Sequence, residues 1–226
     1  MLSRSQSYSE IMKQTIMNDK QNIIICVGRQ LGSGGHDVAK MLAEEFGCMF
    51  YDREVLNLAA RESGLSEEFF AKADERKGFF ESVFGIHFNM PFAVDNAFPE
   101  SGLSQENLFK LQSDAIRKAA SESNCVFVGR CADYVLRDSK RIASIFITAD
   151  MAERVAQISR RHGCSHDEAA KIIEQMEGKR SAYYNYYTDK VWGHSSSYDL
   201  CLNSSCLGVE GTLRMASQFI RMKLGL

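Results

Sequence analysis

The chain has 226 residues, of which 45% are hydrophobic and 25% are charged, a composition typical of a soluble globular protein with one substantial domain. Its formal net charge of −2 excludes a general electrostatic attraction to nucleic acid or to an anionic membrane. No apolar run approaches the ~20 residues of a membrane-spanning helix, so we expect neither nucleic acid nor a membrane as partner.

Seven cysteines are scattered through apolar segments, with no CxxC spacing and no clustering with the five histidines. We expect reduced, buried thiols and no structural zinc site. The first 22 residues contain no apolar segment of the kind that a secretory signal needs. These features predict a cytoplasmic protein.

Residues 1–21 are polar and only weakly periodic, and we interpret them as an N-terminal arm or tail ahead of a single domain over 22–226. The domain begins with a short β-branched strand at 23–27, a glycine-rich turn and a helix with one apolar face. That face consists of Val38, Met41, Leu42 and Phe46. A second short strand is predicted at 48–51.

Residues 54–122 are expected to form an insertion in the domain. Helical segments are predicted over 54–73, and the stretch 78–102, which holds both prolines, is expected to be irregular or a mobile flap. A helix then leads to a third buried strand at 125–128. The apolar face of this helix consists of Leu108, Leu111, Ala115 and Ile116.

Further strands are predicted at 142–147 and 199–202, with two helices between them over 150–190. We expect one helix to open with a capping box of Asp150 and Glu153, and the next with Ser165 and Glu168. Strands that alternate with helices predict a three-layer α/β/α sandwich with a parallel sheet of five strands. The helix that begins near 150 is predicted to face inward with Met151, Val155 and Ile158. The last helix of the chain is predicted to do so with Val209, Leu213, Ala216 and Ile220.

The most informative motif is the glycine-rich turn at 28–37, with the sequence GRQLGSGGHD, between the first strand and the first helix. Ligands of open α/β sheets bind beyond the carboxyl ends of the strands. Glycines let backbone N–H groups approach phosphate oxygens, and the helix N-terminus adds partial positive charge. We therefore expect a nucleoside triphosphate here. The phosphate-binding residues predicted are Gly32, Ser33, Gly34, Gly35 and His36.

The turn departs from the Walker pattern GxxxxGK[ST] at two positions, because Gly35 stands where the lysine belongs and His36 where Ser or Thr belongs. The lysine normally brings positive charge to the transferring phosphates, so another cation must replace it. Arg29, inside the turn, is the first candidate. Ser33 is the candidate to supply the missing hydroxyl to Mg²⁺.

The same turn can be read as a dinucleotide fingerprint of the short-chain dehydrogenase type, since three of its glycines have that spacing and Asp52 ends the second strand. Tyr186 and Lys190 also have the YxxxK spacing of those enzymes. However, no Asn-Ala-Gly follows a later strand, and the serine expected ahead of Tyr186 is absent. The pair Gly129-Arg130 after the third strand suits a phosphate better than a nicotinamide, so this alternative is the weaker one.

Charged side chains follow two of the predicted strands. Arg53 follows the second strand and Arg130 the third, and Asp52 and Asp133 lie beside them in the sequence. The carboxyl ends of parallel strands share one edge of the sheet, so these residues should emerge near the turn, where arginine can bind phosphate through two parallel hydrogen bonds. Further basic residues occur in the 150–190 region: Arg154, Arg160, Arg161, Lys179 and Arg180.

Four segments together resemble the cytidylate kinase-like family, a branch of the P-loop nucleoside monophosphate kinases. They are 25–35, 50–54, 128–134 and 179–184, and the resemblance covers roughly residues 22–222. It implies a P-loop NTPase-like fold with a helical lid at 150–190 and an acceptor-binding insertion at 54–122. It also implies Mg²⁺-dependent transfer of the γ-phosphate of ATP to a nucleoside monophosphate such as CMP or dCMP.

The resemblance further implies roles for single residues. The acceptor would be bound by Asp52, Arg53, Arg130 and Asp133. Catalysis would depend on alignment and charge neutralisation, without a covalent intermediate. The residues in this role would be Arg29, Arg130, Arg154 and Arg180. Two alternatives stay open: a kinase of another small acceptor, and a nucleotide-binding regulator that lost turnover together with its lysine.

Overall fold

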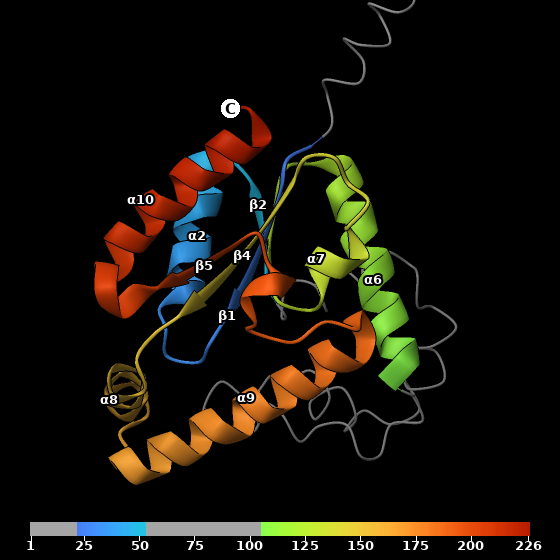
Figure 1. Ribbon diagram of the computed structural model, residues 1–226. Coiled ribbons are helices and arrows are strands. Elements are labelled where there is room, and N and C mark those ends of the chain that lie inside the picture. The colour runs from blue at the N-terminus through green and yellow to red at the C-terminus, as the bar shows by residue number, and fades with distance from the viewer. Residues whose placement is uncertain (1–21, 53–104) are drawn as a thin grey trace, which may run out of the picture.

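The computed structural model describes residues 22–52 and 105–226 (Figure 1). The predictions for the arm at 1–21, for Arg53, for the helical segments at 54–73 and for the flap at 78–102 lie outside the described residues. The described part contains a parallel sheet of five strands in the order β2-β3-β1-β4-β5. The strands are β1 (Ile24–Arg29), β2 (Met49–Tyr51), β3 (Cys125–Val128), β4 (Ile142–Thr148) and β5 (Leu200–Asn203).

The helices of the described part alternate with these strands along the chain, as the sequence predicts. They are α2 (Gly35–Phe46), α6 (Gln105–Glu122), α7 (Ala132–Val135), α8 (Met151–His162), α9 (His166–Thr188), the 3-10 helix η1 (Ser195–Ser197) and α10 (Ser204–Leu224). None of the helices in the described ranges is long and apolar enough to span a bilayer. All seven cysteines fall within those ranges, and all are free thiols.

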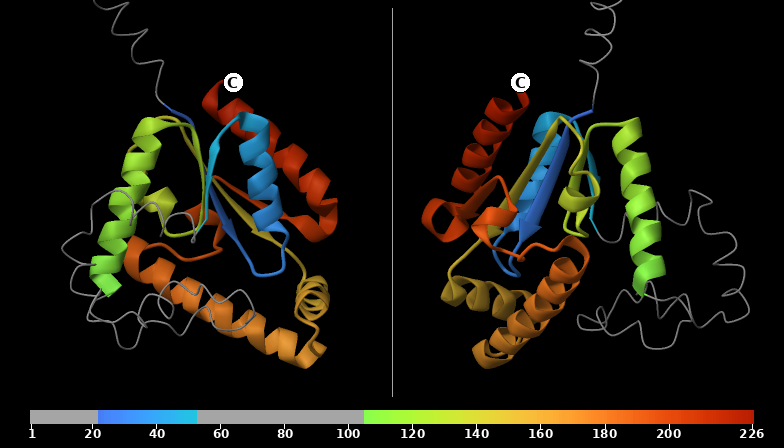
Figure 2. Two further views of the ribbon diagram at one scale, coloured as in Figure 1. Left: turned by 180° about the vertical axis from the view of Figure 1, so that it is seen from behind. Right: turned by 45° about the vertical axis from the view of Figure 1, so that its right-hand side comes forward.

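Helices cover both faces of the sheet (Figures 1 and 2). On one face, α2 and α10 bury Leu42 and Ile220 against β-strand residues that include Ile25. On the other face, α6 and α7 pack through residues such as Ile116 against the neighbouring strand residue Ile24. Successive side chains of a strand point to opposite faces, and a parallel sheet is apolar on both. The three-layer α/β/α architecture is therefore confirmed.

The strand order decides between the two readings of the glycine-rich turn. In β1, Ile24 pairs with Cys125 of β3 on one side and with Ile142 of β4 on the other. In the dinucleotide-binding fold, by contrast, the second strand lies directly beside the first. The order found here excludes that alternative. It also makes β1 and β3 neighbours whose following helices, α2 and α7, cover opposite faces, the arrangement at which open α/β sheets bind ligands.

The helices α8 and α9 lie across the edge at which β1 and β4 end (Figure 1). They pack on each other through a small core of Ile158, Ala169 and Ile173. This pair lies in the region, 150–190, for which the sequence predicts a helical lid, and α8 and α9 are called the lid helices below. By contrast, α6 packs on the sheet through Ile116 and Ala119, so residues 105–122 belong to a layer of the sandwich.

One of the two predicted capping boxes forms. Ser165 accepts a hydrogen bond from the backbone of Glu168, whose carboxylate accepts one in return. The predicted capping box of Asp150 and Glu153 does not form, because side chains at the start of α10 donate hydrogen bonds to both carboxylates. Asn203 donates to Asp150 Oδ1 at 3.0 Å, and the hydroxyl of Ser205 donates to Glu153 Oε2 at 2.8 Å.

Two residues predicted to face inward are exposed instead. Met151, in the first turn of α8, is 44% exposed, and Val209, in α10, is 38% exposed. Met151 lies at the open side of the helix pair, where its sulfur accepts a hydrogen bond from Arg154 at 3.1 Å. Val209 directly follows Gly208, whose positive φ of 64° interrupts the regular helix, so the apolar face of α10 begins later than its spacing predicts.

Candidate functional site

The turn between β1 and α2, residues 28–36, is called the phosphate loop below. It lies at the carboxyl edge of the sheet, next to α8 and α9 (Figure 1). Gly32 and Gly34 adopt positive φ angles of 81° and 69°, which favour glycine. Alternation of such residues with ordinary ones turns successive N–H groups toward a common point, the geometry of an anion-binding nest.

Three N–H groups of the phosphate loop are called open below, because no described protein atom accepts a hydrogen bond from them. Within 22–52 and 105–226, the backbone N–H groups of Gly32, Gly34 and His36 have no hydrogen-bond acceptor. The others are taken: Gln30 donates to the carbonyl of Ile147 at 3.0 Å, for example. The open groups stand at the N-terminus of α2, where the helix dipole favours an anion. The predicted phosphate site therefore has donors in place.

The loop is fastened to the sheet by Ser204, which sequence reasoning missed. Its hydroxyl oxygen lies 2.8 Å from the carbonyl oxygen of Ser33 and 2.9 Å from that of Thr148. Ser204 is the first residue of α10 and is buried. It is 171 residues from Ser33 in the chain, so no local pattern could have linked the two.

Ser33 does not fit the predicted role of a magnesium ligand. Its hydroxyl donates to the carbonyl of Gln30 at 2.9 Å and accepts from the N–H group of Gly35 at 3.3 Å. The side chain is only 3% exposed. Among the residues that the structure describes, no group of three His, Cys, Asp or Glu side chains could hold a metal ion.

The space beside Gly35, where the Walker pattern has its lysine, is taken by the stem of Arg29. A Cβ atom added to Gly35 would lie 2.8 Å from the Cβ atom of Arg29 and 3.1 Å from that of Ile147. The other end of Arg29 reaches the next strand, since its Nη1 atom would lie 4.0 Å from a Cβ atom on Gly129. The side chain thus runs from beneath the phosphate loop to the carboxyl end of β3.

Arg130 occupies a strained backbone at this end of β3. Gly129, Arg130 and Cys131 have φ angles of 72°, 56° and 56°, so two non-glycine residues are left-handed in succession. The guanidinium carbon of Arg130 lies 5.5 Å from the ring centroid of Tyr183 on α9. Tyr183 in turn donates a hydrogen bond to Gln112 of α6 at 3.1 Å. Two helices therefore hold the arginine at the strand end.

Asp52 also lies at this edge, directly after β2. Its Oδ2 atom is 3.5 Å from Nε2 of His36, and the imidazole ring meets the ring of Phe50 edge-on at 5.5 Å. His36 therefore joins the first turn of α2 to the end of β2. Its neighbour Arg53, predicted to bind the acceptor, lies outside the described residues.

Asp133 is buried below this surface and is 8% exposed. Its Oδ2 atom accepts a hydrogen bond from the hydroxyl of Tyr184 at 2.7 Å, and Lys190 Nζ lies 4.0 Å away. Burial raises the pKa of this carboxyl group, while Tyr184 and Lys190 counteract the rise. The Asp133 side chain therefore belongs to a hydrogen-bond network inside the domain, and its main partner is Tyr184. The sequence did not single out Tyr184 for this role.

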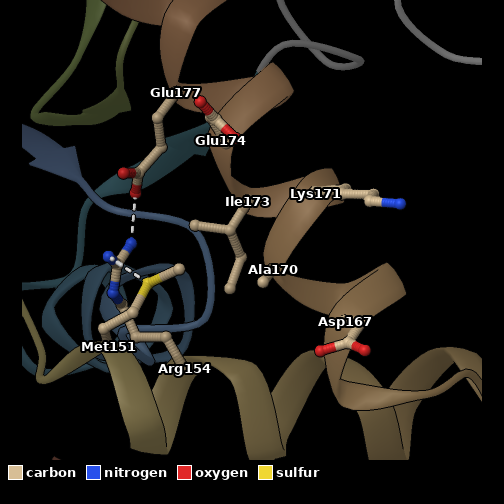
Figure 3. Close-up of a pocket in the computed structure, with 8 residues that line it drawn as sticks. All are labelled: Met151, Arg154, Asp167, Ala170, Lys171, Ile173, Glu174 and Glu177. Atoms are coloured by element: carbon tan, nitrogen blue, oxygen red, sulfur yellow. Dashed lines mark hydrogen bonds and ion pairs between the residues drawn. The ribbon is translucent and has the colours of Figure 1, made fainter.

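Arg154 lies against the phosphate loop but is not exposed to a ligand. It is 6% exposed, and its Nη1 atom lies 2.5 Å from Oε1 of Glu177 (Figure 3). The same nitrogen is 3.5 Å from the carbonyl oxygen of Leu31. Arg180 lies one turn after Glu177 on α9, whereas Arg160 and Arg161 are exposed in the last turn of α8.

A cavity of about 550 Å³ opens between α8 and α9, beside Arg154 and Glu177. The charged side chains at its wall are of both signs, and Lys171 points away from the Arg154–Glu177 pair (Figure 3). No residue of the phosphate loop lines the cavity, so the cavity lies next to the loop, on the other side of Arg154, and does not contain the open N–H groups. Its full lining is Met151, Arg154, Asp167, Ala170, Lys171, Ile173, Glu174 and Glu177.

Comparisons with known proteins agree with this architecture. The model of the cytidylate kinase-like family matches residues 24–206. The cytidylate kinase of Pyrococcus horikoshii is 27% identical over 203 residues, 89% of this chain and 90% of that protein. The cytidylate kinase of Methanocaldococcus jannaschii is 26% identical over 88% of this chain and 97% of that protein.

A solved structure is also similar over most of its length. It is an uncharacterized protein from Eubacterium ventriosum, which is 27% identical and superposes with a TM-score of 0.67, covering 88% of this chain and 98% of that one. The family match spans the phosphate loop, the strand ends and the helix pair α8–α9. The chain belongs to the cytidylate kinase-like family.

Proposed function

We propose that this chain is a nucleotide kinase that transfers the γ-phosphate of ATP to a nucleoside monophosphate, with CMP or dCMP as the acceptor. The observation that carries the proposal is the path of Arg29. Its side chain begins under the phosphate loop and ends beside Gly129, next to Arg130. It therefore links the place of the donor phosphates to the strand end at which we expect the acceptor. The cytidylate kinases among the relatives support the choice of acceptor.

In this proposal the donor triphosphate binds the open N–H groups of Gly32, Gly34 and His36 at the start of α2. Mg²⁺ bound together with ATP would help to neutralise the charge of the phosphates. Arg29 takes the place of the missing lysine and reduces the negative charge between the two substrates. If this assignment holds, these groups would need little reorganisation when the substrates bind, because the open N–H groups and the Arg29 stem are already fixed by the fold.

The acceptor phosphate would be bound by Arg130 and Arg53, with Asp52, which follows β2, contributing to the same site. An oxygen of this phosphate attacks the γ-phosphorus of ATP, the bond from that phosphorus to the bridging oxygen breaks, and ADP leaves. No protein atom becomes covalently attached, so the rate depends on alignment and on charge neutralisation. Residues 54–104 would complete the acceptor site, and α8 and α9 would help to exclude water. Arg180 is a further candidate to neutralise charge in this step.

Release of ADP, measured with a panel of nucleoside monophosphates and with Mg²⁺, tests the proposal. We expect turnover with CMP or dCMP that exceeds turnover with AMP, GMP and UMP. Turnover with a different phosphate acceptor alone would assign another kinase activity to the same site. Binding of ATP in a thermal-shift measurement without turnover for any acceptor would identify a regulator, and absence of ATP binding would refute the proposal.

A further inference from the structure

Glu177 holds the phosphate loop from the lid side. Its Oε1 atom accepts a hydrogen bond from the backbone N–H group of Leu31 at 3.1 Å and one from Arg154 at 2.5 Å. Arg154 also approaches the carbonyl oxygen of Leu31 at 3.5 Å. The N–H and C=O groups of one loop residue are thus held by two side chains of opposite charge, one from each lid helix.

The side chain of Leu31 strengthens the same connection. It packs on the small apolar core that α8 and α9 share, next to Ile158 and Ile173. The backbone of α8 also comes close to the following loop residue, because a Cβ atom on Gly32 would lie 3.0 Å from the Cα atom of Arg154. Leu31 and Gly32 are therefore the places at which the loop and the lid meet.

The arrangement does not block the phosphate site. Glu177 takes the N–H group of Leu31, whereas the open groups belong to Gly32, Gly34 and His36, further along the loop. The Arg154–Glu177 pair is largely buried, with side-chain exposures of 7% and 18%. Arg154 is therefore not exposed for contact with a phosphate. A buried pair of this kind fixes the groups to which it is hydrogen-bonded.

We propose that Glu177, together with Arg154, is a positioning residue that fixes the Leu31 peptide and thereby keeps the phosphate loop in the shape that receives ATP. The expected effect on ATP affinity rests on the proposed function. Neither residue touches the nucleotide. Loss of the contact to the Leu31 N–H group leaves the loop free to sample other shapes, so ATP binds less tightly while the acceptor affinity stays the same.

Two double variants isolate this contact without leaving a buried charge unpaired. Arg154→Met with Glu177→Gln removes the ion pair but keeps an oxygen that can accept from Leu31. In the second variant, Arg154→Met is combined with Glu177→Leu, which keeps a side chain of similar size at position 177 but offers the Leu31 N–H group no acceptor. The control is Glu174→Gln, which changes a charge one turn earlier on α9, at an exposed position of the same cavity.

The measurements are ATP affinity by calorimetry and hydrogen exchange of the Leu31 amide without nucleotide. We expect the control to stay close to the original chain in both measurements. The Gln double variant loses the Arg154 contact to the Leu31 carbonyl but keeps an acceptor for the Leu31 N–H group, so it should lie between the control and the Leu double variant. The Leu double variant should exchange faster at Leu31 and bind ATP about fivefold or more weakly, the loss expected for one unsatisfied buried donor.

Equal ATP affinity of the two double variants would overturn the inference and leave the pair a purely structural role. Tighter ATP binding by the Leu double variant would overturn it too, because Glu177 would then compete with phosphate. If the original chain binds no ATP, the proposed function fails, and hydrogen exchange at Leu31 alone tests the positioning role of Glu177. Faster exchange in the Leu double variant than in the Gln double variant supports that role. Equal exchange in the two double variants overturns it.

Discussion

A Cβ atom at position 35 would lie 2.8 Å from the Cβ atom of Arg29, closer than real Cβ atoms come to other heavy atoms. The glycine and the arginine are therefore linked, since the arginine stem occupies the space that a side chain at position 35 would need. This relationship explains how the phosphate loop departs from the Walker pattern. The start of α2 has a glycine where the Walker pattern has its lysine, and Arg29 carries a positive charge at the end of β1.

Restoring the lysine should consequently fail to improve the protein. Gly35→Lys forces the new side chain against Arg29 and Ile147, and we expect it to lower the free energy of unfolding by about 1–3 kcal/mol. ATP affinity should fall as well. Gly178→Ala is the matched control, because a Cβ atom there meets nothing within 4 Å and the helix should gain about 0.5–1 kcal/mol. Denaturant unfolding and calorimetry measure both quantities. Higher turnover in Gly35→Lys would contradict the assignment of Arg29.

Arg130 should matter for turnover and not for folding. Arg130→Gly removes the guanidinium and relieves a left-handed backbone, so the fold should be unchanged or up to about 1 kcal/mol more stable. The rate should drop by about 10²–10³-fold, as for the loss of one charge-stabilising group. Asp189→Gly relieves the same kind of backbone, φ 54°, at the end of α9 and should leave the rate unchanged. A variant that melts early but keeps its specific activity would show that Arg130 is structural.

The buried carboxyl of Asp133 predicts a distinct pH dependence of stability. Burial raises its pKa, so the folded chain binds this proton more tightly than the unfolded chain does. The resulting stabilisation is complete below the ordinary carboxyl pKa of about 3.9 and is lost as pH rises through the raised value. Asp133→Asn lacks the effect, so the melting temperature of the original chain should improve relative to this variant as pH falls.

Glu45 provides a control of opposite sign for that measurement. Hydrogen bonds from Ser217 and Arg221 lower the pKa of Glu45, so its contribution is present at neutral pH and is lost as pH falls. The advantage of the original chain over Glu45→Gln should therefore shrink toward acid. If the two comparisons had the same sign, the assignment of Asp133 as a carboxyl with a raised pKa would be wrong.

Removal of the Ser204 hydroxyl should loosen the phosphate loop. Ser204→Ala leaves the buried carbonyl groups of Ser33 and Thr148 without this donor, which should cost about 1–3 kcal/mol of stability and weaken ATP binding. Ser181→Ala removes an exposed hydroxyl that bonds only within α9, and its effect should stay within about 0.5 kcal/mol. Equal melting temperatures of the two variants would show that Ser204 does not hold the loop.

The sequence predicted most of the fold because the signals for it are local. The strands at 125–128 and 142–148 are short, mostly apolar segments rich in Val, Ile and Phe, which a sheet covered on both faces can bury. Ser165 with Glu168 is a complete capping signal. Asp150 and Glu153 have the same spacing and fail, since Asn203 and Ser205 compete for them from a distant part of the chain. Spacing alone does not reveal such competition.

The position of a candidate residue in the fold was predictable where the residue is tied to a strand end or to a glycine turn, as for Gly32, Gly34 and Arg130. The role of an arginine was not predictable where a distant carboxylate decides it. The sequence predicted that Arg154 covers the phosphates from the lid, whereas in the structure its guanidinium is hydrogen-bonded to Glu177 and to the carbonyl of Leu31 in the phosphate loop. Glu177 is 146 residues from Leu31 and belongs to no motif, so only the structure could identify it.

The central claim is that the open N–H groups of the phosphate loop bind the ATP phosphates while Arg29 and Arg130 supply the positive charge. A crystal structure with Mg²⁺, a non-hydrolysable ATP analogue and CMP tests it most directly. We predict phosphate oxygens within hydrogen-bond distance of the N–H groups of Gly32, Gly34 and His36, with both guanidinium groups between donor and acceptor. A nest without phosphate, or Arg29 and Arg130 turned away from the nucleotides, would contradict the claim.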